Sequence, residues 1–285
     1  MAEVAFQIQY RQEYVEAFEQ HQSLLRDTTT TDAVIKGQQA VFLVAGSGSA
    51  NAVTRGTNGR IPARPDSLTQ NTCTLQEWHD LVRKTGFNIF ASQGNQRAIM
   101  QMTSVAVVNR KIDSQITTEL STGSVTLGTA AQTIPNLSLV MNAQVKLQNA
   151  SVPWDNNMAL LCQPSFLAYL MQAPEWSSSL YVSDQLRPFA AKSGTWRDMP
   201  AVYRWMNMLV ISHPNLPGRG TNAETSYMYH KSAIGHAMDT AGLQTMADYM
   251  GEQDYSWARA TGYMGAKLLQ NAGVVVITGD GSAYA

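Results

Sequence analysis

The stretch SQGNQRAIMQMTSVAVVNRKIDSQITTELS, residues 92–121, decides the fold class more than any other part of the chain. Its apolar residues recur every three or four positions, which places them on one face of an α-helix. They are Ile99, Met102, Val105, Val108, Ile112, Ile116 and Leu120. A continuous helix over this range would be about 45 Å long. The stretch therefore predicts a structural spine.

The sequence before this helix predicts a long, protruding hairpin. A β-type run through Val41 and Val44 is followed by irregular sequence rich in Gly, Asn, Arg and Pro up to Ser67. The segment TQNTCTLQEW, residues 69–78, then resumes as a strand. Because about twenty irregular residues are unusual inside a compact domain, we interpret residues 37–80 as an extended hairpin.

Residues 3–26 predict a terminal helix with one modest apolar face. Its apolar residues are Val4, Ile8, Val15, Phe18 and Leu25, with Gln and Glu between them. A terminal helix with so thin a stripe is expected to dock on another surface rather than join a central core. We interpret it as an arm.

The remaining sequence predicts a mixed lobe of short helices and strands. Helices are expected at 136–149 and at Pro164–Met171. Strands are expected at Met158–Cys162, Val202–Ile211, Tyr255–Leu269 and Val274–Thr278. The predicted fold class is therefore α+β.

Composition favours self-association. Charged residues make up 14% of the chain, against roughly 25% in typical soluble proteins, so much of the surface costs little to desolvate. The net charge of -1 leaves no basic excess for tight nucleic-acid binding. Neither a signal peptide nor an apolar membrane span is expected.

Motifs for catalysis and cofactor binding do not emerge from the sequence. The segment GSGSAN at 46–51 lacks the lysine of a phosphate loop, and no Gly-x-Ser-x-Gly occurs. The histidines are scattered, and Cys73 and Cys162 are expected to be buried thiols. Glu77, His79 and Asp80 crowd together but are interpreted as a polar strand end. We predict no enzyme activity, no cofactor and no metal site.

Three segments resemble the major capsid proteins of tailed bacteriophages, which have the HK97-like fold. Residues 78–120, WHDLVRKTGFNIFASQGNQRAIMQMTSVAVVNRKIDSQITTEL, resemble the passage from hairpin to spine in that family. NMALLCQPSFLAYLM resembles its strand and helix at the start of the lobe, and YSWARATGYMGAKLLQNAGVVVITGD resembles its late strands. The resemblance implies a shell-building subunit.

The resemblance also implies a division of the chain. It gives an N-terminal arm at 1–36, an extended loop at 37–80, a peripheral domain at 81–134 and 252–272, and an axial domain at 135–251 and 273–285.

Some family members bond a lysine of this loop to a neighbour's asparagine, but no lysine lies between Gly37 and Asp80. Arginine pairs non-covalently with carboxylates instead, so a non-covalent shell is expected. The candidate intersubunit contacts are Arg55, Arg60, Arg64, Trp78 and Phe18.

The expected partners are further copies of the chain, in pentamers and hexamers around packaged double-stranded DNA that is bound without sequence specificity. Because the chain begins at Met1 directly with the arm, a separate scaffolding protein is expected, with a portal and possible decoration proteins. The expected location is the virion, after synthesis in the bacterial cytoplasm. A bacterial nanocompartment shell protein with the same fold and a soluble α+β enzyme are the alternatives.

Overall fold

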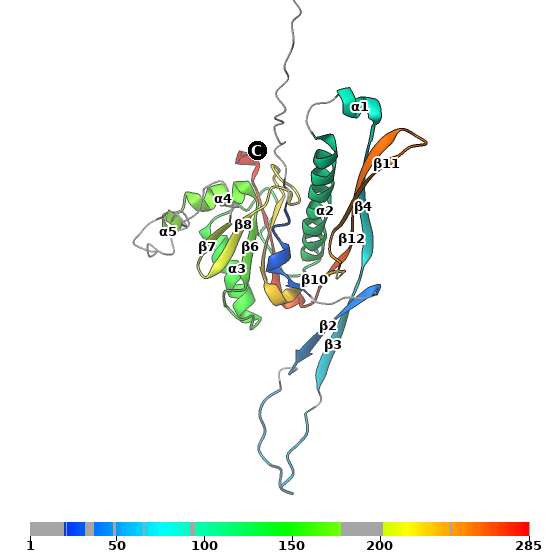
Figure 1. The fold of residues 1–285 in the computed structure, drawn as a ribbon. Coiled ribbons are helices and arrows are strands. Elements are labelled where there is room, and N and C mark those ends of the chain that lie inside the picture. The colour runs from blue at the N-terminus through cyan, green and yellow to red at the C-terminus, as the bar shows by residue number, and fades with distance from the viewer. Residues whose placement is uncertain are drawn as a thin grey trace, which may run out of the picture.

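The computed structural model describes residues 20, 22–31, 37–47, 50–64, 66–91, 95–177, 202–239 and 241–284. They form a mixed α+β body with two main sheets and a narrow hairpin that projects from one end (Figure 1). The predicted α+β class is confirmed. Among these residues, no helix combines the length and the apolarity needed to cross a bilayer.

The predicted spine is helix α2, Gln96–Ser121. It begins at Gln96 because the Asn95 side chain accepts a hydrogen bond from the backbone N–H of Ala98 and so satisfies a donor of the first turn. Residues 92–94, also within the predicted helix, lie outside the described residues. Its buried apolar side chains are Met100, Ala106, Val108, Ile112, Ile116 and Leu120. The predicted spine is confirmed.

The spine packs on a five-stranded sheet built around one long strand. That strand is β12, Tyr255–Leu268. The strand β4, Gln76–Thr85, pairs along one edge of β12. The strands β10, Ile234–Met238, and β11, Gln244–Met250, share the other edge. The short strand β1, Thr30–Thr31, extends the sheet beside β10.

A second sheet of six strands forms the other half of the body, in the order β5-β13-β9-β6-β8-β7. Its strands are β5, Thr126–Leu127; β6, Met158–Cys162; β7, Val202–Trp205; β8, Met208–Ser212; β9, Glu224–His230; and β13, Val274–Gly279. The helices of this half are α3, Leu137–Asn149; α4, Pro164–Met171; and α5, Pro174–Ser177. The predicted helices at 136–149 and 164–171 and the strand at 158–162 are confirmed.

The single strand predicted at Val202–Ile211 is wrong, because the chain reverses in its middle. Met206 and Asn207 both have positive φ, 48° and 61°, the backbone of a tight hairpin turn. The turn joins β7 to β8 as an antiparallel pair. An uninterrupted apolar run concealed it, because methionine is not a usual turn residue.

The predicted hairpin is present. Its two paired strands are each shorter than the loop that joins them. Strands β2, Gln39–Gly46, and β3, Ser67–Thr74, pair antiparallel as a separate two-stranded sheet. The single strand predicted at 69–78 is wrong, because the chain leaves this sheet at Leu75 and enters β4 of the large one. The hairpin points away from the body (Figure 1).

The predicted arm helix at 3–26 falls mostly outside the described residues. From Arg26 to Thr28 the chain forms a short 3-10 helix, and Leu25 is fully buried beside the spine. The buried side chain of Leu25 therefore fixes the first described residues to the spine.

Candidate functional site

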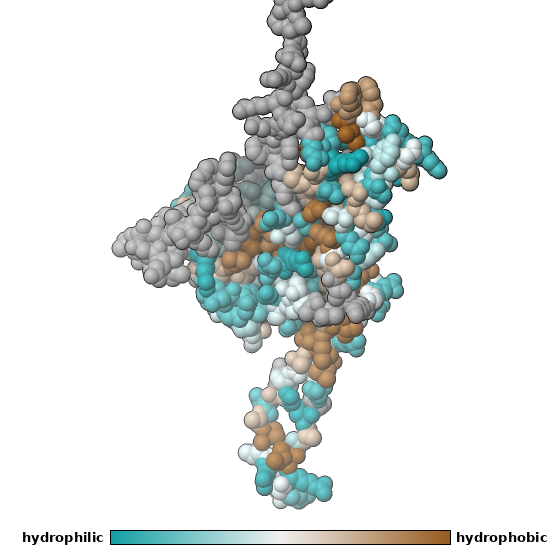
Figure 2. Space-filling model, viewed as in Figure 1, coloured by the Kyte–Doolittle hydropathy of each residue, from teal (hydrophilic) through white to brown (hydrophobic). Residues whose placement is uncertain are grey.

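The extended hairpin exposes one apolar face. Ala40 and Phe42 of β2 are buried, whereas the alternate residues Val41 and Leu43 are exposed, Leu43 to 65%. Leu68 of β3 is also exposed, and Figure 2 shows apolar surface over these strands. An isolated two-stranded hairpin is marginally stable in water, and an apolar patch of this kind marks a contact surface.

The base of the hairpin is fixed to the large sheet by close packing. The ring of Phe42 lies over Gly235 of β10, where an added Cβ would stand 2.9 Å from the ring. A Cβ on Gly265 of β12 would stand 2.7 Å from the carbonyl oxygen of Thr74. The side chain of Asn71 donates to the carbonyl of Leu269 over 3.2 Å. The two glycines therefore let the hairpin approach the body closely.

The hairpin loop presents the three predicted arginines. Arg55, Arg60 and Arg64 are all exposed. A turn shapes the tip, with the N–H of Gly56 donating to the carbonyl of Arg60 over 3.0 Å. Arg64 reaches the carbonyl of Ser47 across the loop at 3.3 Å. Since no carboxylate lies between Gly46 and Arg64, the loop tip is cationic.

The turn between β11 and β12, at the opposite end of the body, carries acidic side chains that the sequence reasoning missed, while Arg83 of the neighbouring β4 lies 5.1 Å from the ring centroid of Tyr255. The β11–β12 hairpin carries Asp248, Glu252 and Asp254, with no Lys or Arg from Gln244 to Ala258. The Tyr249 hydroxyl donates to Asp254 over 2.7 Å. The lack of Lys and Arg in this stretch could have been read from the sequence, but the position of the turn in the folded protein could not.

Apolar side chains lie beside this acidic end. They belong to α1, Gly86–Ala91, whose first N–H donates to the carbonyl of Asp254 over 3.1 Å. Phe87 and Phe90 of this helix are 74% and 88% exposed. Figure 2 shows the resulting apolar surface at the top of the molecule. Aromatic side chains this exposed are expected to be covered by a partner.

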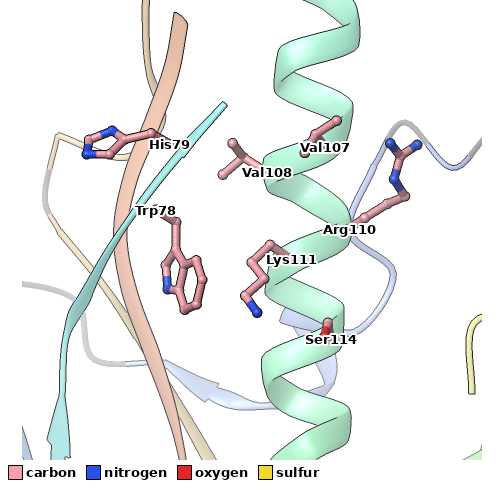
Figure 3. Close-up of a pocket in the computed structure, with 7 residues that line it drawn as sticks. All are labelled: Trp78, His79, Val107, Val108, Arg110, Lys111 and Ser114. Carbon is pink, nitrogen blue, oxygen red and sulfur yellow. The ribbon is translucent and has the colours of Figure 1, made fainter. Parts of the chain in front are cut away.

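Trp78 is positioned mainly by its own chain. Its indole is half-buried, packs on the core beneath the spine and lies 3.9 Å from Lys111 Nζ, measured to the ring centroid. The two side chains border a cavity of about 310 Å³ between β4 and α2 (Figure 3). Val107, Val108, Arg110, Ser114 and His79 complete its lining. Phe18, the other predicted aromatic contact, lies outside the described residues.

A buried carboxylate on the spine holds the start of the body, and the sequence reasoning missed it. Asp113 accepts hydrogen bonds from the backbone N–H groups of Leu24 and Leu25, at 3.1 and 3.2 Å. The Ser23 hydroxyl at 2.5 Å and the Gln20 amide also donate to it. A charged residue directly after Ile112, within the apolar stripe, was the signal for this site.

Asp113 also reaches the six-stranded half through His213. Nε2 of His213 lies 3.2 Å from the carboxylate, while its Nδ1 accepts from the N–H of Asn215. This pattern fits the neutral tautomer with its proton on Nε2. Burial alone would raise the pKa of Asp113, but the hydrogen bonds from His213, Ser23, Leu24 and Gln20 hold that pKa below its ordinary value.

Two polar side chains also meet on strand β4. Glu77 and His79 lie on the same face of β4, with Nε2 of His79 2.8 Å from a carboxylate oxygen of Glu77. Residues two apart on a strand share a face. Across the described residues, no three His, Cys, Asp or Glu side chains are placed to hold a metal ion.

A family model described as phage capsid protein matches residues 2–280. The chain belongs to the phage capsid protein family. This family membership and the HK97-like fold give it the role of a major capsid protein, a structural subunit of the shell of the virion.

Solved structures show the same fold for this capsid protein. A chain from Mycobacterium phage Che8 is 15% identical with a TM-score of 0.74, and the match covers 97% of this chain and 98% of that one. The cyanophage Pam1 capsid gives 10% identity, a TM-score of 0.72 and coverage of 99% and 98%. The head of Helicobacter pylori bacteriophage KHP40 gives 10% identity and a TM-score of 0.69, and the match covers 96% of this chain and 95% of that one. A search of curated protein sequences finds no significant match.

Proposed function

We propose that this capsid protein assembles into the icosahedral head of a tailed phage, as pentamers and hexamers that enclose double-stranded DNA. The projecting hairpin carries the proposal, because its exposed apolar face and cationic tip have no use in a free monomer. Each subunit contact can be weak, since closing a shell makes the last contacts effectively intramolecular.

The hairpin tip of one subunit is proposed to bind the acidic end of the next. Arg55, Arg60 and Arg64 lie at one end of the molecule, and the β11–β12 turn lies at the other (Figure 1). They cannot meet within one chain, so their complementary charges favour a head-to-tail contact between copies. Guanidinium groups pair with carboxylates through two parallel hydrogen bonds, which suits a non-covalent shell.

The proposed division of the subunit follows that implied by the resemblance. The arm is 1–36, the extended loop 37–80, the peripheral domain 81–134 with 252–272, and the axial domain 135–251 with 273–285. Strand β4 already pairs with β12 from Gln76 onward, so residues 76–80 of the extended loop lie in the same sheet as the peripheral domain. The two buried clusters, one under the spine and one around α3, support a two-domain body.

The further partners are proposed on chemical grounds. A net charge of -1 favours confinement of DNA by volume over sequence-specific binding. A separate scaffolding protein, a portal and decoration proteins would complete the particle. Synthesis and assembly are proposed to take place in the cytoplasm of the bacterial host. Trp78 and Phe18 stay predictions as intersubunit contacts.

Negative-stain electron microscopy and sedimentation velocity of the purified chain test this proposal. Closed shells, or rings of five and six subunits, are the expected result. A folded chain that stays monomeric in crowding agent, both alone and with a scaffolding protein from the same phage, would overturn the assembly proposal.

A further inference from the structure

The first described part of the body forms a strap, residues 22–31, that contacts the spine and both sheets. The backbone N–H of Leu25 donates to the carboxylate of Asp113 on the spine over 3.2 Å. Oγ1 of Thr28 lies 2.6 Å from the hydroxyl of Tyr229 in β9 of the six-stranded sheet. The last two residues of the strap pair with β10 of the five-stranded sheet as β1. The strap is therefore held by hydrogen bonds to three different elements.

A histidine is buried beside the strap without a hydrogen bond of its own. His236 is the middle residue of β10 and is 1% exposed. Alternate residues of a strand share a face, so its ring lies on the same side as Ile234 and Met238, which belong to the core cluster under the spine. Neither ring nitrogen has a hydrogen-bond partner among the described residues. A charge on such a ring would be costly, because burial removes the water that would solvate it.

The strap covers the edge of the sheet at this ring. Strand β1 is the outermost strand beside β10, and Thr31 lies opposite His236. Leu25 of the strap fills the same core cluster as Ile234. Removing the strap would therefore open the edge of β10 to water and leave β12 paired on its other side.

Two charged groups act on the ring, and they oppose each other. Arg26 of the strap disfavours a proton on His236, and Asp113 of the spine favours one. The Asp113 carboxylate is already hydrogen-bonded to His213 and to the strap. Ala266, which lies opposite His236 on β12, carries no charge.

The other ionisable side chains next to β10 lie away from the ring. Lys267 is opposite Gly235 on β12, so it faces the other side of the sheet, and its Nζ is 4.0 Å from Glu119 of the spine. Cys73 packs with Ala237 on that side as well. A proton on His236 would therefore add a buried cation beside the positively charged strap.

We propose that the strap is an acid-sensitive latch, in which protonation of His236 releases residues 22–31 from α2 and β10 while both sheets stay folded. Release lets water reach the ring and lets Arg26 move away from the new charge. The open strap binds a proton that the closed strap excludes, so acid shifts the equilibrium toward the open form. The shell proposal does not enter this argument.

Hydrogen exchange of the full-length chain at pH 7 and pH 5 tests the latch, with rates corrected for the intrinsic effect of pH. Burial, and after it the charge of Arg26, lowers the pKa of His236 from 6.5 to about 4. The opening equilibrium of the strap should therefore rise about twentyfold between the two pH values. The amides that report it donate hydrogen bonds from within the strap and belong to Leu24, Leu25, Thr28 and Thr29.

His236→Leu is the matched variant, because leucine fills a similar volume and carries no charge at any pH. His236→Gln replaces it if circular dichroism shows that the leucine variant is not folded. In the variant, exchange in the strap should no longer change between pH 7 and pH 5. His79→Gln, at an exposed histidine of β4, should keep the twentyfold change.

The amides of β6 distinguish local release from unfolding of the whole body. They lie in a fully buried strand and should stay far better protected than the strap at both pH values. Equal protection in β6 and the strap would mean that the strap opens only when the body unfolds. A strap response that is absent in the wild-type chain, or that survives in the variant at His236, would mean that this histidine does not control the strap. Each of these results overturns the proposal, whether or not shells form.

Discussion

The ring of Phe42 covers the backbone of Gly235, and this contact is where the extended hairpin meets the body. A methyl group at Gly235 would lie 2.9 Å from the ring, inside normal contact distance. Phe42, Ala40 and Cys73 form a small buried cluster with Ala237 of β10. The direction of the hairpin therefore depends in part on the contact between this aromatic side chain and this glycine.

Gly235→Ala is expected to displace the Phe42 ring and loosen the hairpin, at a cost of roughly 1–3 kcal/mol for overpacking. Hydrogen exchange should then speed up in residues 39–46, while the spine α2 keeps its protection. Gly251→Ala is the control, because the nearest atom to its added Cβ is 3.9 Å away. Unchanged exchange in the hairpin would show that Phe42 does not hold it.

Asp113→Ala is expected to lower the free energy of unfolding by about 3–5 kcal/mol at neutral pH. The N–H groups of Leu24 and Leu25 would lose their acceptor while still buried. Urea denaturation measures the change, and Ser114→Ala, at the exposed next position, should be nearly neutral. A loss below about 1 kcal/mol would mean that water replaces the carboxylate.

The same carboxylate predicts an acid dependence of stability. Because the folded-state pKa of Asp113 lies below its unfolded value, its contribution is fully present above the unfolded pKa. That contribution is lost as the pH falls through the folded pKa. Asp113→Asn should remove this component from a stability profile below about pH 4. An unchanged acid limb in the variant would contradict the assignment.

His236 predicts a second, milder acid effect. Its ring is buried, and neither nitrogen has a hydrogen-bond partner among the described residues. Burial, and after it the charge of Arg26, lower the pKa of His236 to about 4, while the charge of Asp113 acts in the opposite direction. The unfolded chain therefore binds a proton that the native state excludes, so stability falls as the pH drops from about 6.5 to about 4.

His236→Leu should flatten the stability profile across this window, by roughly 3 kcal/mol over the whole range. Thermal or urea unfolding at half-unit pH steps measures it. The histidines at 21, 79, 213 and 230 remain in both proteins, so the difference between the two profiles isolates His236. Parallel profiles would show that another group causes the acid loss.

Charge reversal tests the proposed head-to-tail contact. Arg55→Glu with Arg60→Glu should block assembly, because each opposed pair loses about 0.2–1 kcal/mol at every copy of the contact. Adding Asp248→Lys and Glu252→Lys should restore it, since the charges are then exchanged. Light scattering follows assembly, and circular dichroism checks the fold. If the changes at Asp248 and Glu252 do not restore assembly, the arginines bind elsewhere and the proposed contact is wrong.

The elements that could be predicted from the sequence are those with one buried face or with distinct boundaries. The spine α2 followed from its period, and α4 began where Pro164 suits the first turn of a helix. The strands β9 and β10 were missed because nearly every residue in them is buried, and β11 because every residue in it is exposed. Neither pattern alternates, so neither produces the period that identifies a strand.

The candidate site divides in the same way. The presence of arginine and the absence of lysine in the hairpin can be read from the sequence and do not depend on the fold. The Phe42–Gly235 contact and the Asp113 cluster join residues far apart in the chain, from position 20 to position 235. The acidic residues of the β11–β12 turn are neighbours in sequence, but only the fold places them at the end opposite the hairpin arginines.

The sequence by itself determined the α+β class, the spine and the cationic hairpin, because helical period and local composition are encoded within a few turns of chain. Only the tertiary structure decided that the cationic hairpin and the acidic β11–β12 turn lie at opposite ends of the molecule, and which residues surround Asp113. Those relationships depend on strand pairing and on burial, which bring distant residues together.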